Sequence, residues 1–213
     1  MRLNPKAFDA FLAGDSGIGQ EFLWRRSWAC PCRDPHSGAA DPQCPQCSGK
    51  GRIWGDAVPG RAGMTAQNIK KEWIQAGLYE SGDATITVPE SSPIYEAGQF
   101  DRLTLLNSTD SFSVSLTRGD VTERLWFRVA ALSRVFWIDG DGVIVDGGLP
   151  SVSEDGIITW GSGAPDVGVQ YSISGTKFNE YYIPYSMPSD RAEHYGARLP
   201  KKIIARAFDL FGR

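Results

Sequence analysis

Four cysteines in one short, proline-rich window constrain the fold of this chain more than any other feature of its sequence. They occur as Cys30-Pro-Cys32 and, after eleven intervening residues, as Cys44-Pro-Gln-Cys47. Prolines at positions 31, 35, 42 and 45 lie among them, and this density disfavours regular secondary structure between residues 19 and 54. The window therefore needs some other constraint to be ordered.

The spacing of the cysteines indicates a metal site. In a reducing cytosol, clustered thiols are metal ligands before they are disulfides. A Cys-Pro-x-Cys-x-Gly turn aims two thiolates at one point, and its glycine lets backbone N–H groups approach the sulfurs. Thiolate sulfur suits zinc, and four such ligands close a tetrahedral structural site. We expect one zinc ion held by Cys30, Cys32, Cys44 and Cys47.

Two alternatives to the four-cysteine zinc site remain open. The sulfurs of a Cys-x-Cys pair reach one metal less comfortably than those of Cys-x-x-Cys, and His36 offers a replacement for Cys30. The second alternative is disulfides or free thiols, which gains weight if the protein ends in an extracellular particle where zinc loss and oxidation occur. A catalytic zinc is not expected, because protein groups fill all four positions.

The rest of the sequence predicts a mainly β fold. Residues 4–13 are typical of a short amphipathic helix with Asn4 as N-cap and Gly14 at its end. Beyond Trp54, short alternating segments are separated by glycine- and aspartate-rich turns, as in an antiparallel β-sandwich or small barrel. The candidate strands are 84–88, 102–106, 112–116, 123–130, 133–138, 143–145, 157–160 and 168–174.

We expect four segments along the chain. They are an N-terminal helical arm (1–18), a zinc-binding loop module (19–58), a β-sandwich or barrel domain (59–175) and an aromatic, basic C-terminal arm (176–213). A weaker helical pattern covers 65–77. Within the arm, 200–211 is compatible with a short basic amphipathic helix.

The sequence predicts a binding protein and not an enzyme. Its two histidines lie far apart, and it contains no phosphate-binding loop, hydrolase elbow or zinc-protease motif. The stretch 138–148 (IDGDGVIVDGG) lacks the glutamate that ends an EF-hand loop, so a glycine-rich hairpin turn is favoured over a calcium site. A net charge of −3 gives no global attraction to nucleic acid or anionic lipid. No stretch is apolar enough to span a membrane or to act as a signal peptide.

Aromatic and basic side chains supply the candidate docking residues. The tryptophans around the cysteine window either pack over the zinc module or form a docking surface with neighbouring arginines. The tail tyrosines need partners for their hydroxyls, so an interface is as compatible as a core. The basic tail is a solvated face or contacts DNA or an acidic partner. The candidate partner-binding residues are Trp24, Arg25, Arg26, Tyr181, Tyr182, Tyr185, Arg198, Lys201 and Lys202.

One local resemblance supports the zinc prediction. Residues 44–51 (CPQCSGKG) resemble one half of the zinc-binding repeat of DnaJ-type chaperones, which reads Cys-x-x-Cys-x-Gly-x-Gly. That family carries four copies, whereas this chain has one full copy and a Cys-x-Cys departure from it. The resemblance therefore implies the zinc knuckle and not the chaperone function.

Over much of its length, the order of features resembles that of small structural proteins of tailed bacteriophages, most closely those of the neck or collar between head and tail. The resemblance is carried by residues 30–54, 97–107, 157–174 and 197–206. It implies a ring of identical subunits at or near the portal, in contact with other neck or tail proteins, with genomic DNA passing through the lumen. Such a protein is assembled in the bacterial cytoplasm and ends in the virion.

Two other functions stay open at this stage. One is a baseplate or other tail structural protein of the same kind of particle. The other, from a different class, is a zinc-bearing chaperone-like or redox adaptor. A redox adaptor needs a reactive cysteine pair, whereas a structural site holds thiols that react only after the metal is removed.

Overall fold

The computed structural model describes residues 5–14, 17–47, 49–65, 83–185, 193–194 and 196–211. The mainly β fold with an N-terminal helix is confirmed. The chain forms two compact units. Met1–Asn107 and Glu180–Arg213 form the barrel unit, and Ser108–Asn179 form the inserted unit. No helix in the described ranges has the length and apolar character that crossing a membrane requires.

The barrel unit is a sheet that closes on itself. Its strands are β1 (Gln20–Ala29), β2 (Arg52–Thr65), β3 (Ala84–Val88), the first part of β4 (Arg102–Thr117), the end of β9 (Gln170–Tyr182) and β12 (Lys201–Ala207). Neighbours pair in the order β12-β3-β2-β1-β4-β9, and β12 also pairs with β9. The register places Phe22 opposite Gly60, Ile203 opposite Ile86 and Arg206 opposite Tyr182. Closure removes the free strand edges of this sheet.

Side chains on every second position of the strands fill the interior of the barrel unit. In β3, Ala84, Ile86 and Val88 are buried while the two threonines between them are half-buried, which is the period of two expected of a strand with one buried face. Phe22 and Leu103, from β1 and β4, are fully buried in the same cluster. The core sits inside the barrel and beneath η1 (Pro93–Glu96).

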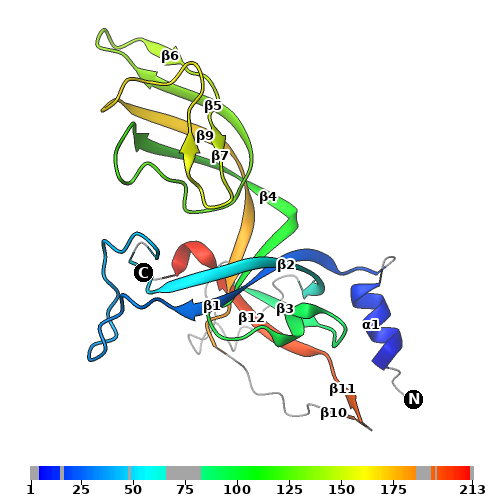
Figure 1. Ribbon diagram of the computed structural model, residues 1–213. Helices are drawn as coiled ribbons and strands as arrows, with labels where there is room; N and C mark the ends of the chain where they lie inside the picture. The colour runs from blue at the N-terminus through cyan, green and yellow to red at the C-terminus, as the bar shows by residue number, and fades with distance from the viewer. Residues whose placement is uncertain are drawn as a thin grey trace, which may run out of the picture. The chain divides into compact units, whose positions relative to one another are not determined.

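The helix α1 (Pro5–Ala13) packs on the barrel unit (Figure 1). The backbone N–H of Gly14 donates to the carbonyl of Ala10 at the end of the helix, as the sequence predicted. Leu12 is buried over Gly63 of β2, where a Cβ would come within 2.6 Å of Leu12 Cδ2. Glycine at position 63 therefore makes room for the helix. The predicted N-cap, Asn4, lies outside the described residues.

The inserted unit has its own small core. Here β5 (Val129–Ile138) pairs with β9 and with β6 (Ile144–Asp146), and β7 (Ser151–Val152) pairs with β8 (Ile158–Thr159). The second part of β4 and the first part of β9 complete the unit. Its buried side chains are Phe112, Leu125, Val135, Tyr171 and Ile173. The predicted hairpin turn after Ile138 is confirmed: Gly142 has a φ of +81°, and Asp139 Oδ1 accepts the N–H groups of Asp141 and Val143.

Several predictions about secondary structure need correction, among them the candidate strand 123–130, of which only Val129 and Ala130 lie in a strand, β5. The expectation of an irregular window from 19 to 54 was wrong at both ends, because β1 continues to Ala29 and β2 begins at Arg52. The expectation of a helix at 200–211 was wrong, because 201–207 form β12 and only Phe208–Leu210 (η2) turn as a short 3-10 helix. The segments 102–106 and 112–116 belong to one long strand, β4.

Other predicted segments fall differently in the structure. The segment 176–182, expected in a C-terminal arm, belongs to β9, and the boundary drawn at 58 falls within β2. The helical pattern at 65–77 lies outside the described residues beyond Thr65, which ends β2. A small hairpin of β10 (Glu193–His194) and β11 (Ala197–Arg198) precedes β12.

Candidate metal centre

The cysteine loop is the connection of a long β-hairpin. The paired strands β1 and β2 end at the Ala29–Arg52 pair, and the loop of residues 30–51 extends beyond them (Figure 1). At its base the N–H of Cys30 donates to the carbonyl of Gly51 over 3.0 Å. This pairing brings the Cys-x-Cys half and the Cys-x-x-Cys half together.

The four sulfur atoms form one compact group. Cys30 Sγ lies 3.8 Å from Cys44 Sγ, and Cys32 Sγ lies 3.4 Å from Cys47 Sγ. All four ligand atoms lie within 4.8 Å of one another. Four sulfurs at about 2.3 Å from a central zinc would stand about 3.8 Å apart in a tetrahedron. The thiols are free, and these separations are far longer than a disulfide bond of about 2.05 Å. The cluster therefore has the ligand set and size of a metal site.

Local turns hold the second half of the site. The N–H of Gly51 donates to Cys47 Sγ over 3.3 Å, and the N–H of Lys50 donates to the Cys47 carbonyl. Gly49 and Gly51 have φ angles of +79° and +66°, a region that side chains with a Cβ rarely adopt. The predicted role of glycine in folding the backbone around the sulfurs is thus seen in the structure.

The thiols differ in their readiness to ionise. Backbone N–H groups of Cys47 and Gln46 lower the pKa of Cys44 to about 7. Burial raises the pKa of Cys32 to about 12. The Cys44 thiolate is therefore available near neutral pH, whereas the Cys32 thiolate needs a cation to stabilise its charge.

The alternative ligand, His36, lies outside the sulfur group. Its side chain is exposed on a turn in which Asp34 Oδ1 accepts the N–H groups of His36 and Ser37. These bonds lower the pKa of Asp34, with the Ser37 N–H as the largest cause. The structure thus assembles the four cysteines without this histidine.

An aromatic cluster lies at the base of the loop. The ring of Trp54 contacts Phe208 and Phe211 edge-on, with centroids 5.2 and 5.6 Å apart. Cations cover the cluster: Lys50 Nζ lies 4.7 Å from the Phe208 centroid, and the Arg102 guanidinium lies 4.1 Å from the same ring. The C-terminal turn η2 is thereby tied to the cysteine loop.

The backbone of Phe100 is strained beside this cluster. Its φ is +68°, in the left-handed region, which costs a non-glycine residue about 1–3 kcal/mol. Its N–H donates to Ile183 over 2.7 Å and its carbonyl accepts Trp54 Nε1 over 3.0 Å. Arg52 lies 4.1 Å from the Phe100 ring centroid. These contacts hold the strained conformation.

Of the predicted docking residues near the loop, Trp24 has an internal partner. Trp24 is half-buried, and its Nε1 donates to Asp101 Oδ2 over 2.8 Å. Asp101 is buried and also accepts the N–H of Ser27. Arg25 is half-buried and Arg26 is exposed. Asp101 was missed by the sequence reasoning, because its contacts with Trp24 and Ser27 join residues more than seventy positions apart.

The predicted tail residues are divided between the core and the surface. Tyr182 is buried with its ring 4.9 Å from that of Phe211, and Tyr181 packs against the barrel core. Lys201 Nζ donates to the carbonyl of Ala97 over 2.9 Å. The remaining three are Tyr185, half-buried, and Arg198 and Lys202, both exposed.

A half-buried carboxylate, that of Glu123, organises the inserted unit. Glu123 Oε1 accepts Trp160 Nε1 over 2.8 Å and the Tyr171 hydroxyl over 2.9 Å, while its other oxygen accepts Arg118 and the Gly119 N–H. Burial raises the pKa of Glu123, but the Gly119 N–H and the side-chain donors outweigh it, so the pKa lies below its ordinary value. No sequence signal marked this residue.

The inserted unit also exposes many large apolar side chains. Among the described residues, eight of the thirteen exposed large apolar side chains belong to this smaller unit. Ile138 and Ile144 pair across the β5–β6 hairpin and are 62% and 55% exposed. The others are Val121, Trp126, Val143, Leu149, Ile157 and Val167. Exposed apolar side chains that lie side by side, as Ile138 and Ile144 do, favour a contact surface.

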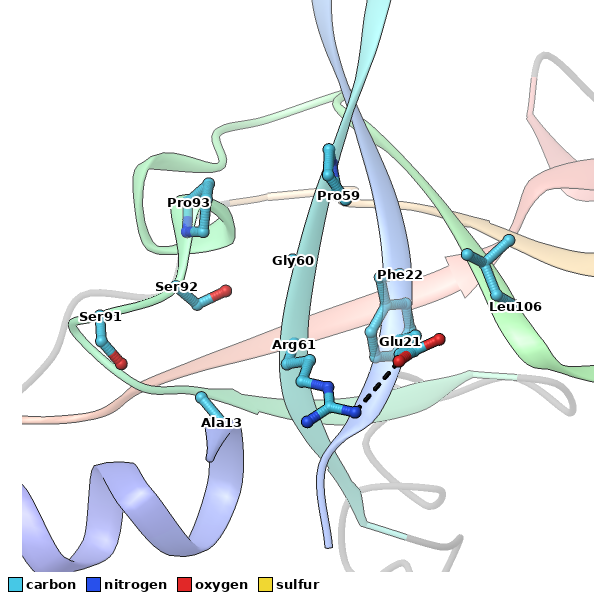
Figure 2. Close-up of a pocket in the computed structure, with 10 residues that line it drawn as sticks. All are labelled: Ala13, Glu21, Phe22, Pro59, Gly60, Arg61, Ser91, Ser92, Pro93 and Leu106. Atoms are coloured by element: carbon cyan, nitrogen blue, oxygen red, sulfur yellow. Dashed lines mark hydrogen bonds and ion pairs between the residues drawn. The ribbon is translucent and has the colours of Figure 1, made fainter. Parts of the chain in front are cut away.

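A groove of about 520 Å³ opens on the barrel unit (Figure 2). Pro59, Pro93 and Leu106 contribute apolar walls, and Arg61 Nη2 lies 3.0 Å from Glu21 Oε1. Figure 2 shows the Ser92 hydroxyl directed toward Gly60. The other lining residues are Ala13, Phe22, Gly60 and Ser91. The groove thus combines apolar walls with an ion pair.

The comparisons with known proteins assign no family to this chain. No family model and no curated protein sequence matches this chain. The fold and the site define the class of protein: it is a mainly β protein that carries a four-cysteine cluster of metal-binding size on a hairpin loop.

Proposed function

We propose that this protein is a structural subunit of a tailed bacteriophage particle and forms part of the neck or collar that joins the head to the tail. One observation carries an assembly role: the eight large apolar side chains exposed on the inserted unit. A surface of this kind favours burial against another subunit, because transfer of apolar area from water is favourable. The kind of particle is proposed from the sequence resemblance over 30–54, 97–107, 157–174 and 197–206.

Zinc has a structural role in this proposal. Cys30, Cys32, Cys44 and Cys47 would hold one ion, whose charge stabilises the thiolates and whose bonds tie the two halves of the loop. The ligand set is complete without water or substrate, so the site does no chemistry on other molecules. Below the site, Lys50 and the Phe208 ring join the loop to the C-terminal turn.

The proposed partners are further copies of this chain in a ring, and the portal and other neck or tail proteins. The apolar hairpin end around Ile138 and Ile144 is the proposed contact surface. The mixed groove between Pro59 and Pro93 suits a protruding segment of a neighbouring protein. Genomic DNA passing through the ring would meet local basic groups such as Lys202.

Native mass spectrometry with negative-stain microscopy tests the assembly role. We expect the zinc-loaded chain to form cyclic oligomers alone or on the portal ring of the same phage. The double substitution Ile138→Asp and Ile144→Asp should abolish them, because each added carboxylate would be buried in the contact. Ile18→Asp, at an exposed position of the barrel unit, is the matched control and should still assemble.

The other functions predict different results in the same samples. Binding to baseplate proteins in place of the portal would indicate a baseplate or other tail structural protein. Capture of an unfolded client by the isolated chain would indicate a chaperone-like adaptor. A chain that stays monomeric at high concentration and binds neither portal nor tail proteins would contradict the proposed assembly role.

A further inference from the structure

Two close sulfur contacts of the metal site join one half of the loop to the other. Cys30 Sγ lies 3.8 Å from Cys44 Sγ, and Cys32 Sγ lies 3.4 Å from Cys47 Sγ. Both pairs therefore cross between the Cys-x-Cys and Cys-x-x-Cys halves. A metal ion and a pair of crosswise disulfides would tie the same two segments.

We propose that the site has a second closed form, in which oxidation releases the metal and joins the same sulfurs as disulfides Cys30–Cys44 and Cys32–Cys47. This inference rests on the zinc site of the proposed function. The oxidant is of the peroxide class, which takes two electrons from each pair of sulfurs. The loop thereby keeps its two halves tied when the protein leaves a reducing cytosol for oxidising surroundings.

The backbone around the site favours this connectivity. The Cys30 N–H to Gly51 carbonyl bond and the Ala29–Arg52 strand pair hold the halves side by side without help from the metal. In an unfolded chain, closure of the shortest loops is favoured, which leads to Cys30–Cys32 and Cys44–Cys47. Four cysteines allow three disulfide pairings. Of these, the crosswise pairing is expected only when the loop is folded before it is oxidised.

Burial sets the order of the two oxidation steps. Cys30, Cys44 and Cys47 are 3%, 7% and 4% exposed, whereas Cys32 is half-buried and the most accessible to an oxidant. The Cys32 sulfur attacks one peroxide oxygen, the O–O bond breaks, and Cys32 sulfenic acid and hydroxide form. The Cys47 sulfur, 3.4 Å away, then attacks the Cys32 sulfur. An S–S bond forms, hydroxide leaves, and two protons from solvent complete two water molecules.

The remaining pair follows by the same chemistry. With Cys32 and Cys47 joined, two thiolates remain, and two ligands do not hold zinc in a tetrahedral site. A second peroxide then oxidises Cys30 and Cys44, which lie 3.8 Å apart. One metal ion is released for two peroxides consumed, and four sulfurs are each oxidised by one electron.

The test is oxidation of the zinc-loaded full chain with hydrogen peroxide, followed by non-reducing peptide mapping and by a chromogenic chelator that reports released zinc. We expect one zinc released per chain, only the two crosswise disulfides at completion, and Cys32–Cys47 enriched among singly oxidised chains. The same chain oxidised in guanidinium is the matched control and should shift toward Cys30–Cys32 and Cys44–Cys47.

The outcomes separate this inference from the zinc proposal. Zinc content measured before oxidation tests the metal site alone. If zinc is present and the folded chain yields Cys30–Cys32 and Cys44–Cys47, sulfinic acids or disulfides between chains, the inference is overturned while the metal site stands. Cys47→Ser should remove the Cys32 disulfide of the first step. If Cys32 in that variant instead pairs readily with Cys30, the ordered crosswise route is also overturned.

Discussion

The two units of this chain stabilise their folds in different ways. The barrel unit closes its sheet, surrounds an aliphatic interior and adds a metal-sized cysteine cluster on the loop between β1 and β2. The inserted unit has a smaller core and gathers four donors around one carboxylate, Glu123. It also leaves Ile138 and Ile144 exposed.

The difference indicates a division of roles. Both units cover aromatic rings with the chain's own cations, as Arg102 covers Trp54 in the barrel unit and Arg118 covers Trp160 in the inserted unit. In the inserted unit, apolar side chains remain in solvent at positions that its own core does not use. We propose that the inserted unit buries its exposed apolar side chains against another protein.

Removal of the metal should give the largest effect and should act on one unit. Cys44→Ser removes one of four ligands, and structural zinc contributes on the order of 10 kcal/mol to folding. We expect loss of bound zinc and rapid amide exchange in residues 30–51, with the inserted unit unchanged. Hydrogen-exchange mass spectrometry resolves the two units in one experiment.

The matched control for that variant is His36→Ala. His36 is exposed and lies outside the sulfur group, so its removal should leave zinc content and exchange rates as they are. Loss of zinc on this substitution would mean that a histidine completes the site.

Truncation of Phe208 should give the next largest effect. Its buried ring contacts Trp54, Phe211 and the guanidinium of Arg102, and a phenylalanine to alanine change in such a place costs about 3 kcal/mol. Chemical denaturation of Phe208→Ala should show this loss, with faster exchange in the zinc loop through Lys50. Phe11→Ala, at a ring 52% exposed, should change stability little.

Neutralisation of Glu123 should destabilise the inserted unit alone. Glu123→Gln replaces a carboxylate that accepts four donors, and the lost charge-assisted bonds are worth about 2 kcal/mol. Exchange in residues 108–179 should rise while the zinc loop stays protected. Equal effects on both units would contradict their independence.

Acid should produce the same selective loss in the unaltered chain. The folded pKa of Glu123 lies below its ordinary value of 4.5. Its stabilising contribution is therefore complete above that value and is lost as pH falls toward the folded pKa. Glu123→Gln should flatten this part of the pH profile, which thermal melts in a pH series measure.

The smallest stability effect is expected on the exposed hairpin. Ile138→Asp and Ile144→Asp replace side chains that already face solvent, so the free energy of unfolding should change by less than about 0.5 kcal/mol. A large decrease in the free energy of unfolding would mean that these residues stabilise the monomer. The inserted unit would then not differ from the barrel unit in this respect.

What the sequence predicted well was local. The helix start at Pro5, the strand 84–88 and the glycine-dependent turn after Cys47 follow from neighbouring residues, and each is present. The four-cysteine cluster was also predicted from the spacing within each half, although the hairpin that joins the two halves was not.

What the sequence could not predict was set by distant partners. The prolines of the window disfavoured strands there, so the ends of β1 and β2 were not predicted. Pro59 lies in β2 at a position that pairs with β1 alone, because the pairing of β2 with β3 starts at Gly63. The apolar run 203–205 is compatible with helix or strand until β3 pairs with it. Glu123 meets Trp160 and Tyr171 across 37 and 48 residues, a relation that no local pattern carries.

In the proposed metal centre the four cysteines, and no histidine, hold one zinc ion. X-ray absorption at the zinc edge on the purified full chain tests it most directly. We predict one zinc per chain, with four sulfur neighbours at about 2.3 Å and no nitrogen neighbour. A nitrogen or oxygen neighbour at about 2.0–2.1 Å, or a folded chain that carries no zinc, would contradict the account.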